Sequence, residues 1–156
     1  MRQLSADRIV PAPAADVFAL LADPSRHREF DGSGTLRGRA ADTGPVRGAG
    51  DRFGMDMRLG PFPYRTVNTV VTYEKNRVIG WQTWLQVGRV RVTGGHTWRY
   101  ELAELGDDGT RVTEVYDWST ARYPRLAVEW PGFPRRTGPA MRTTLDRLAT
   151  HFLTRP

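Results

Sequence analysis

One short stretch in the second half of the chain places an acidic side chain among aromatic ones. Residues 112–119 read VTEVYDWS. Because successive side chains of a β-strand point to opposite faces, Glu114, Tyr116 and Trp118 share one face of this segment. A carboxyl group surrounded by aromatic rings is costly to ionise, so its pKa should rise, as it does for general acids in apolar pockets. Glu114 is therefore a candidate general acid or base, or a polar anchor for a ligand.

The length of the preceding loop decides whether this face points into the protein. A five-residue loop at 105–109 would pair Leu102 with Val112 and turn the even-numbered residues inward. A four-residue loop would turn Asp117 and its odd-numbered neighbours inward instead. We prefer the five-residue loop because it buries two large aromatic side chains.

A structural explanation of Glu114 stays open beside the functional one. The carboxylate could be paired with an arginine such as Arg99 or Arg65, or it could lie at the solvated rim of the sheet. Structural ion pairs also perturb carboxyl groups, so the residue type alone does not decide between the two explanations.

Aromatic side chains supply further candidate site residues. Trp81, Trp98 and Tyr100 could stack on a flat ligand. The hydroxyl groups of Tyr100 and Tyr116 could hydrogen-bond a phenol or a ketone. The alternative for all four residues is ordinary core packing.

No motif indicates a metal or a cofactor. His27, His96 and His151 stand apart without the paired spacing of metal ligands, so no metal site is expected. His96 lies on the same strand face as the aromatic residues and could carry a proton, or it could be a surface residue at a strand end. The segment 29–38, EFDGSGTLRG, lies between a helix and a strand rather than between a strand and a helix, so we interpret it as a turn capped by Asp31 and not as a phosphate loop.

The periodicity of the chain predicts an antiparallel sheet followed by a long helix. A helix begins near Pro13, and a second short helix starts at Asp23-Pro24. A terminal helix from about residue 137 to 153 carries Met141, Leu145 and Leu148 on one stripe. Residues 120–139 are expected to be irregular, apart from a helical turn at 126–129. Strands with a period of two are expected at 3–10, 35–41, 51–58, 65–73, 78–87, 96–105 and 111–119.

Composition indicates a folded protein of one domain, residues 1–156. Hydrophobic residues make up 39% and charged residues 26%, which excludes a disordered chain. The net charge of +6 comes from scattered arginines, and Lys75 is the only lysine, so no nucleic-acid partner is expected. We expect a cytoplasmic protein without membrane insertion, since there is no cysteine, no apolar signal-peptide core, and no apolar run longer than 17–22.

Motifs spread over nearly the whole chain carry a resemblance to a known superfamily. They are VPAPAADVFALLADPSRHREF (10–30), FGMDMRLG (53–60), GGHTWRYELAEL (94–105), GTRVTEVYDWS (109–119) and the terminal helix. This order of elements resembles the SRPBCC or START-like superfamily, and more narrowly its bacterial polyketide cyclase/dehydrase-like subgroup. The resemblance implies the α+β helix-grip fold: a curved antiparallel sheet around a long C-terminal helix, with two short helices after the first strand.

The resemblance also implies a cavity between sheet and helix that binds a hydrophobic small molecule, either aromatic, polyketide-like or lipid-like. Cofactor-free cyclisation or dehydration is one expected activity, with Glu114, Tyr116 or His96 moving protons. A non-catalytic lipid or metabolite carrier, or a regulatory partner-binding module using the segment 130–133, remains open, as does the choice between monomer and homodimer. The expected cavity residues are Phe30, Phe53, Met55, Met57, Trp81, Trp98, Tyr100, Trp118, Met141 and Leu145.

Overall fold

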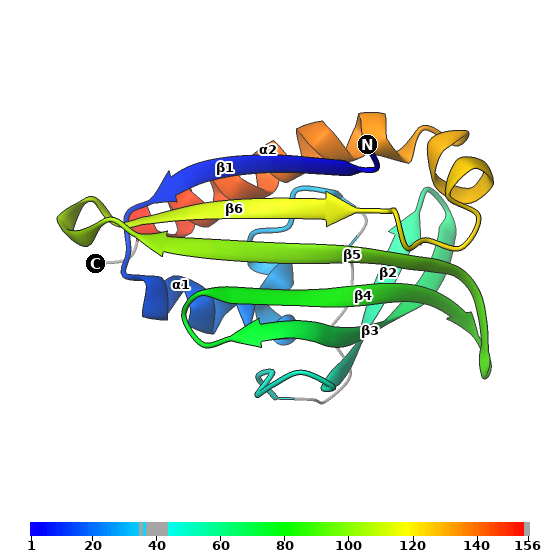
Figure 1. Cartoon of the computed structure of the whole chain (residues 1–156), viewed down its shortest axis with the longest axis horizontal. Helices are drawn as coiled ribbons and strands as arrows, with labels where there is room; N and C mark the ends of the chain where they lie inside the picture. Colours follow the sequence, from blue (N-terminus) through cyan, green and yellow to red (C-terminus); the bar gives the residue numbers. More distant parts are fainter. Residues whose placement is uncertain (35, 37–43, 155–156) are drawn as a thin grey trace.

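The computed structural model describes residues 1–34, 36 and 44–154 (Figure 1). It confirms the α+β helix-grip architecture expected from the sequence, with two short helices after the first strand and a long helix at the C-terminal end. The elements are β1 (Gln3–Val10), α1 (Ala14–Leu21), η1 (Pro24–Glu29), β2 (Arg52–Leu59), β3 (Phe62–Glu74), β4 (Val78–Val87), β5 (Val90–Glu104), η2 (Gly106–Asp108), β6 (Thr110–Asp117), η3 (Pro124–Glu129) and α2 (Phe133–Leu153).

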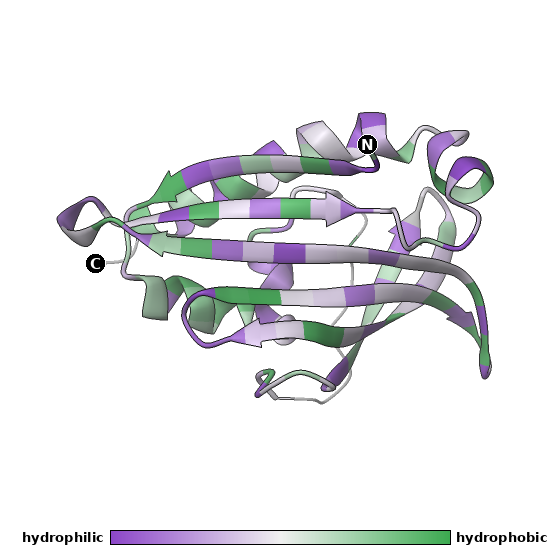
Figure 2. Ribbon diagram, in the orientation of Figure 1, coloured by the Kyte–Doolittle hydropathy of each residue, from purple (hydrophilic) through white to green (hydrophobic). Residues whose placement is uncertain are grey.

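The strands form one antiparallel sheet in the order β1-β6-β5-β4-β3-β2, with the helices gathered on one side of it (Figure 1). Hydrophilic and hydrophobic residues are mixed along β5 and β6 (Figure 2), and β6 has buried residues on both faces, including Glu114 and Val115. The long helix α2 packs against β1 and reaches β6, while α1 packs against β5. The most deeply buried side chains come from both layers: Val17, Leu20, Val70, Ile79, Val112, Leu145 and Leu148.

The start signals of the short helices act as predicted. The carboxylate of Asp23 accepts a hydrogen bond from the backbone N–H of Ser25, and Pro24 occupies the first position of η1. The turn that follows is locked onto α2, because the N–H of Gly32 donates to the hydroxyl of Thr144 over 2.9 Å. A Cβ at Gly32 would lie 2.6 Å from the backbone nitrogen of Thr144, so only glycine permits this close approach.

The two largest errors in the predicted boundaries both lie at glycine or proline residues; β3 (Phe62–Glu74) and β6 (Thr110–Asp117) differ from their predicted ranges by three residues or fewer at each end. Strand β5 begins at Val90 rather than at residue 96, because Gly94 and Gly95 form an irregularity in the β4–β5 pairing instead of ending the strand. Helix α2 begins at Phe133 rather than near residue 137, since Pro134 lies in the first turn, where its missing N–H costs nothing. The strand predicted at 35–41 lies outside the described residues, except for Leu36, which bridges to Met57.

The bend at Gly94 gives a first test of the fold. Gly94 has a φ of +127°, and a Cβ there would lie 2.5 Å from the carbonyl oxygen of Thr83. We expect Gly94→Ala to lower the free energy of unfolding by more than ~1 kcal/mol, measured by urea denaturation. Gly138→Ala in α2 is the matched control, because nothing lies within 4 Å of a Cβ there and alanine favours the helix. Equal stability of the two variants would show that the bend does not require glycine.

Candidate functional site

The pairing of β5 with β6 fixes which side chains face the interior. Leu102 is paired with Val112 and Tyr100 with Glu114, which is the register predicted from a five-residue loop. Glu114 is 3% exposed and lies on the same strand face as the buried Tyr116. Val115 points to the other face of β6 and is also buried. Strand β6 lies between β1 and β5 in the sheet. The register therefore places the carboxyl group of Glu114 inside the protein.

The carboxyl group of Glu114 has one hydrogen-bond partner and one unsatisfied oxygen. The hydroxyl of Tyr100 donates to Oε1 over 2.9 Å, whereas Oε2 is buried and has no partner among the described residues. Burial raises the pKa of Glu114 to about 8; the hydrogen bond from Tyr100 opposes this rise, and the nearby charge of Asp31 adds to it. Glu114 is consequently protonated at neutral pH, and its unpaired oxygen can donate a hydrogen bond or a proton.

The arginines that could have neutralised Glu114 point elsewhere. Arg99 pairs with Glu101 over 2.7 Å, and Arg65 pairs with Asp56 over 3.1 Å. Within the described residues, Glu114 forms no ion pair. The paired-carboxylate explanation with Arg99 or Arg65 is therefore wrong, and so is a position at the solvated rim.

Aromatic rings line the interior beside Glu114. Trp98 and Tyr116, which are cross-strand partners, stack with their ring centroids 4.5 Å apart. Trp118 lies 5.2 Å from Tyr116 on the other side, and His96 lies 5.4 Å from it. Burial raises the pKa of Tyr116 to about 12, so its hydroxyl keeps its proton. The four rings form a contiguous cluster on β5, β6 and the residues that follow β6, in which His96 stands edge-on to Trp98 and Tyr116.

His96 and His27 occupy different environments. Burial lowers the pKa of His96 to about 4, so this half-buried residue is neutral at physiological pH and can accept a proton. His27 is buried, its Nε2 lies 2.7 Å from the carbonyl oxygen of Leu21, and its ring stacks on Trp81. Burial also lowers the pKa of His27. Since Nε2 must donate to the carbonyl, His27 serves packing rather than proton transfer.

The sequence analysis missed a polar group on the inner face of β3 and β4. Asn68 and Thr83 are buried cross-strand partners, and the hydroxyl of Thr83 donates to Oδ1 of Asn68 over 2.7 Å. Asn68 also donates to the carbonyl oxygen of Phe53. Thr83 is in turn paired with His96, so polar side chains extend across three strands. The period of two in β3 could have revealed Asn68, because it shares parity with the apolar Val70.

The residues predicted to line a cavity lie in two parts of the interior. Phe30, Phe53, Met55, Trp81, Tyr100 and Leu145 belong to the larger core cluster, and Met57 packs against it half-buried. Trp118 and Met141 belong to the smaller cluster around Tyr116, and Trp98 contacts both clusters while remaining half-buried. The inner face is therefore incompletely covered at Met57, His96 and Trp98.

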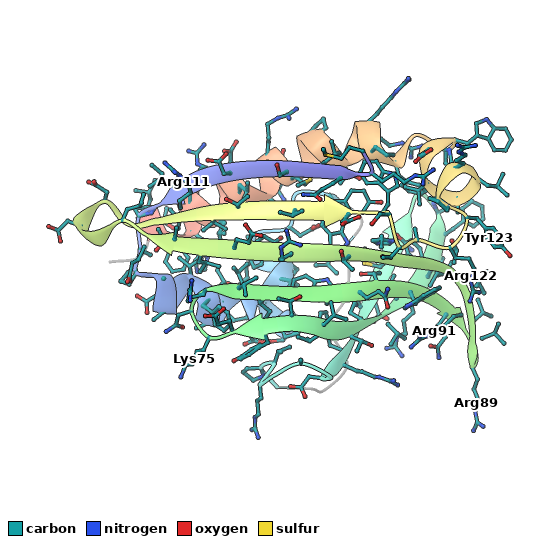
Figure 3. All side chains as sticks on the ribbon, in the orientation of Figure 1. Lys75, Arg89, Arg91, Arg111, Arg122 and Tyr123 are labelled. Carbon is teal, nitrogen blue, oxygen red and sulfur yellow. The ribbon has the colours of Figure 1, made fainter. Side chains whose placement is uncertain are left out.

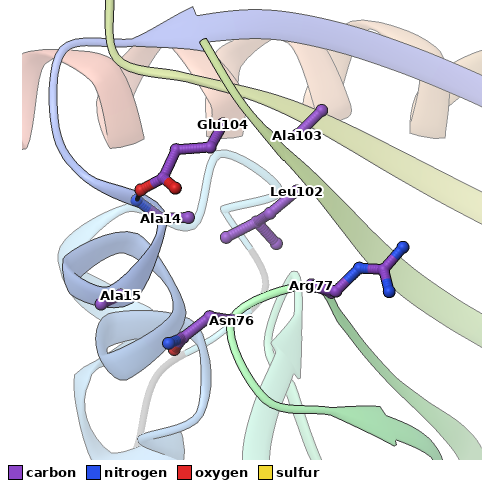
Figure 4. Close-up of a pocket in the computed structure, with 7 residues that line it drawn as sticks. All are labelled: Ala14, Ala15, Asn76, Arg77, Leu102, Ala103 and Glu104. Atoms are coloured by element: carbon purple, nitrogen blue, oxygen red, sulfur yellow. Dashed lines mark hydrogen bonds between the residues drawn. The ribbon is translucent and has the colours of Figure 1, made fainter. Parts of the chain in front are cut away.

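The two clearest surface pockets lie away from Glu114. One of about 410 Å³ is lined by α1, the β3–β4 turn and the end of β5, including Ala14, Asn76 and Glu104 (Figure 4). Its carboxylate is already engaged, because Glu104 accepts a hydrogen bond from the backbone N–H of Ala14. The other pocket, of about 250 Å³, is lined by residues of the segment 44–52. Neither pocket gathers the titratable and aromatic groups found around Glu114.

The sequence of this protein matches a known family. The family described as "Polyketide cyclase / dehydrase and lipid transport" matches residues 1–153, and the chain belongs to this family. The SRPBCC-type resemblance noted from the sequence motifs is thereby confirmed.

Individual relatives and solved structures extend this comparison. The uncharacterized protein Rv0088 of Mycobacterium tuberculosis is 35% identical over 146 residues, which are 92% of this chain and 61% of that protein. The chain thus spans about three-fifths of the length of the curated relatives it matches. Protein CV1439 from Chromobacterium violaceum has a TM-score of 0.69 at 12% identity, covering 96% of each chain. Protein Ms6760 from Mycobacterium smegmatis has a TM-score of 0.68 at 15% identity, covering 97% of this chain and 91% of that one. These two structures show a common fold.

The buried carboxyl group predicts a pH dependence of stability. Because the pKa of Glu114 rises from 4.5 to about 8 on folding, its contribution is most favourable below about pH 4.5 and is lost as the pH rises through 8. We expect the free energy of unfolding of the wild type to fall by on the order of a few kcal/mol between those pH values. Glu114→Gln, which can still accept the hydrogen bond from Tyr100, should not show this fall. Urea denaturation across this pH range measures the difference, and the exposed Glu101→Gln on the same hairpin is the control. If the free energy of unfolding of wild type and of Glu114→Gln changed with pH in the same way, the protonation state assigned to Glu114 would be contradicted.

Proposed function

We propose that the chain binds a neutral, hydrophobic small molecule of aromatic or polyketide type between the inner face of the sheet and α2. The observation that carries this proposal is the buried, unpaired Oε2 of Glu114. A buried polar group without a partner is costly, and a ligand carbonyl or hydroxyl oxygen would satisfy it. The membership in a family of polyketide cyclases, dehydrases and lipid transport proteins supports the same class of ligand.

The side chains around Glu114 suit a flat ligand with few polar atoms. The stacked rings of Trp98 and Tyr116 offer an aromatic wall, while the protonated carboxyl group of Glu114 offers a single donor. Ligand sites are typically apolar with a small number of placed polar groups, and this interior has that composition. Binding would orient the ligand by one hydrogen bond and by the shape of the surrounding apolar surface.

The chemistry that this arrangement supports is cyclisation or dehydration without a cofactor. Glu114 would donate its proton to a carbonyl or hydroxyl oxygen and raise the electrophilicity of the attached carbon. Neutral His96 would accept a proton from the ligand, and the hydroxyl of Tyr116, whose ring contacts that of His96, would stabilise developing negative charge. A carrier without activity would use the same cavity for shape and apolar area alone, so turnover of a bound ligand distinguishes the enzyme from the carrier.

The binding proposal is tested with two ligands of matched shape. Flavone has a carbonyl group, whereas 2-phenylnaphthalene is a comparable hydrocarbon without one. We expect Glu114→Leu to weaken flavone binding about fivefold and to leave the hydrocarbon unaffected, because one net hydrogen bond of ~1 kcal/mol is lost. Quenching of tryptophan fluorescence measures both affinities, and flavone affinity should also fall above about pH 8, where Glu114 ionises.

The control is Glu101→Leu, which removes an exposed carboxylate from the same hairpin. It should alter neither affinity. Equal losses for both ligands in Glu114→Leu would indicate a damaged interior rather than a lost hydrogen bond. No binding of either ligand to the wild-type protein, combined with no bound metabolite in native mass spectrometry, would refute the proposed cavity.

A further inference from the structure

One end of the molecule combines exposed apolar side chains with positive charge. It consists of residues 87–92, at the tip of the β4–β5 hairpin, and residues 122–136, which include η3 (Figure 3). The two segments are joined, because the N–H of Arg122 donates to the carbonyl oxygen of Gly94 and its guanidinium donates to that of Arg91. We call these two segments together the arginine–aromatic surface.

The apolar side chains of this surface point into solvent. Trp130 is 82% exposed, Tyr123 66% and Leu126 61%, whereas Val128 between them is buried against the smaller core cluster. The hairpin tip adds the exposed Val90. The sequence analysis proposed only residues 130–133 as an exposed apolar patch, and the structure shows a larger one built from two segments.

The positive charge of this surface is not neutralised. Its only acidic residue is Glu129, which turns toward the sheet and accepts hydrogen bonds from Arg2 (2.6 Å) and from the indole of Trp118 (3.1 Å). Within the described part of the chain, none of the surface's arginines forms an ion pair with a carboxylate. They are Arg89, Arg91, Arg122, Arg125, Arg135 and Arg136.

The backbone holds this surface in a defined shape. Tyr123 and Gly132, which flank the turn η3, both have positive φ values, 54° and 81°. A non-glycine residue in this conformation is uncommon and is often found at functional sites. The guanidinium groups of Arg91 and Arg122 lie over the ring of Trp84, at 5.2 and 5.1 Å, and so fasten the turn to the hairpin.

The surface adjoins the end of the sheet where the inner face is incompletely covered. The hydroxyl of Thr120 donates to the carbonyl oxygen of Gly95 over 2.6 Å, and His96 is the next residue along β5. His96 and Trp98 are two of the inward-facing residues that stay half-buried. A hydrophobic molecule leaving or entering the interior at this end would pass beside the arginine–aromatic surface.

We propose that the arginine–aromatic surface docks the protein peripherally on an anionic lipid bilayer, which goes beyond the ligand binding proposed above. No helix in the described ranges has the length and apolar character needed to cross a bilayer, so the contact would be with the headgroup region. Tryptophan and tyrosine favour that region, and arginines there are attracted to anionic lipids. Apolar and basic residues are interspersed in both segments, unlike the apolar centre and polar rim of a protein interface.

Sedimentation with vesicles tests this proposal. We expect the protein to bind vesicles of phosphatidylcholine mixed with phosphatidylglycerol, and to bind pure phosphatidylcholine at least tenfold more weakly. High salt should weaken the binding, since the attraction is screened. Trp130→Ala should reduce the affinity severalfold by removing an interfacial anchor, and Arg89→Gln/Arg125→Gln should reduce it at least tenfold.

Matched controls lie at the opposite end of the molecule. Lys75→Gln/Arg111→Gln removes the same charge from residues remote from the arginine–aromatic surface (Figure 3), and Leu153→Ala removes an exposed apolar side chain there. Both should leave vesicle binding within about twofold of wild type. If the test and control variants lost equal affinity for the vesicles, net charge alone would explain the binding and the proposal would be overturned. No vesicle binding, a concentration-dependent dimer that Trp130→Ala abolishes, or tighter binding to an RNA oligonucleotide than to the vesicles would also overturn it.

Discussion

The antiparallel register between β5 and β6 is the constraint on which the interior depends. Pairing Leu102 with Val112 sets Glu114 opposite Tyr100 and Tyr116 opposite Trp98. A shift by one residue would send all of these side chains to the solvent face, because the side-chain period of a strand is two. The register is held by the loop at Leu105–Gly109, where the N–H of Leu105 donates to the carbonyl oxygen of Gly109. The electrostatics of the site thus follow from the geometry of one hairpin.

A buried carboxyl group that lacks a charged partner reduces stability in exchange for an uncommon chemical property. At neutral pH an exposed glutamate is ionised and can only accept hydrogen bonds, whereas a protonated one can also donate. Tyr100 occupies one oxygen and thereby fixes the orientation of the carboxyl group, which leaves Oε2 without a partner among the described residues. The aromatic neighbours exclude water and keep the local dielectric low, so any hydrogen bond formed at Oε2 is strengthened.

Much of the fold could be predicted from the sequence, because alternation and turn residues are local signals. Both ends of β1 and β4 agree with the prediction, whereas β5 and α2 begin earlier than predicted. Gly94 and Pro134 are local signals for the end of an element, but the strand and the helix accommodate them. The inward face of Glu114 was predicted because that register buries Tyr116 and Trp118, and the pairing confirms the register. Whether Glu114 could pair with Arg99 depended on the register of β5 and β6. In the observed register Glu114 lies beside Tyr100, and Arg99, the neighbour of Tyr100 along the strand, points to the opposite face. The surface at 122–136 was also hidden, because left-handed backbone at Tyr123 has no reliable sequence signal.

The strand order has a consequence for the order in which the chain can fold. Among the residues that the structure describes, strand β1 has β6 as its only neighbour in the sheet, with Gln3 paired to Asp117 and Val10 to Thr110, and α2 packs on it as well. During synthesis from the N-terminus, β1 therefore has no partner until more than two-thirds of the chain has emerged from the ribosome. The hairpins from β2 to β5 can form first from local contacts, and closing the long loop to β1 is an inherently slow final step. An N-terminal strand that waits this long must avoid early self-association, and charged residues such as Asp7 and Arg8 within β1 serve that purpose.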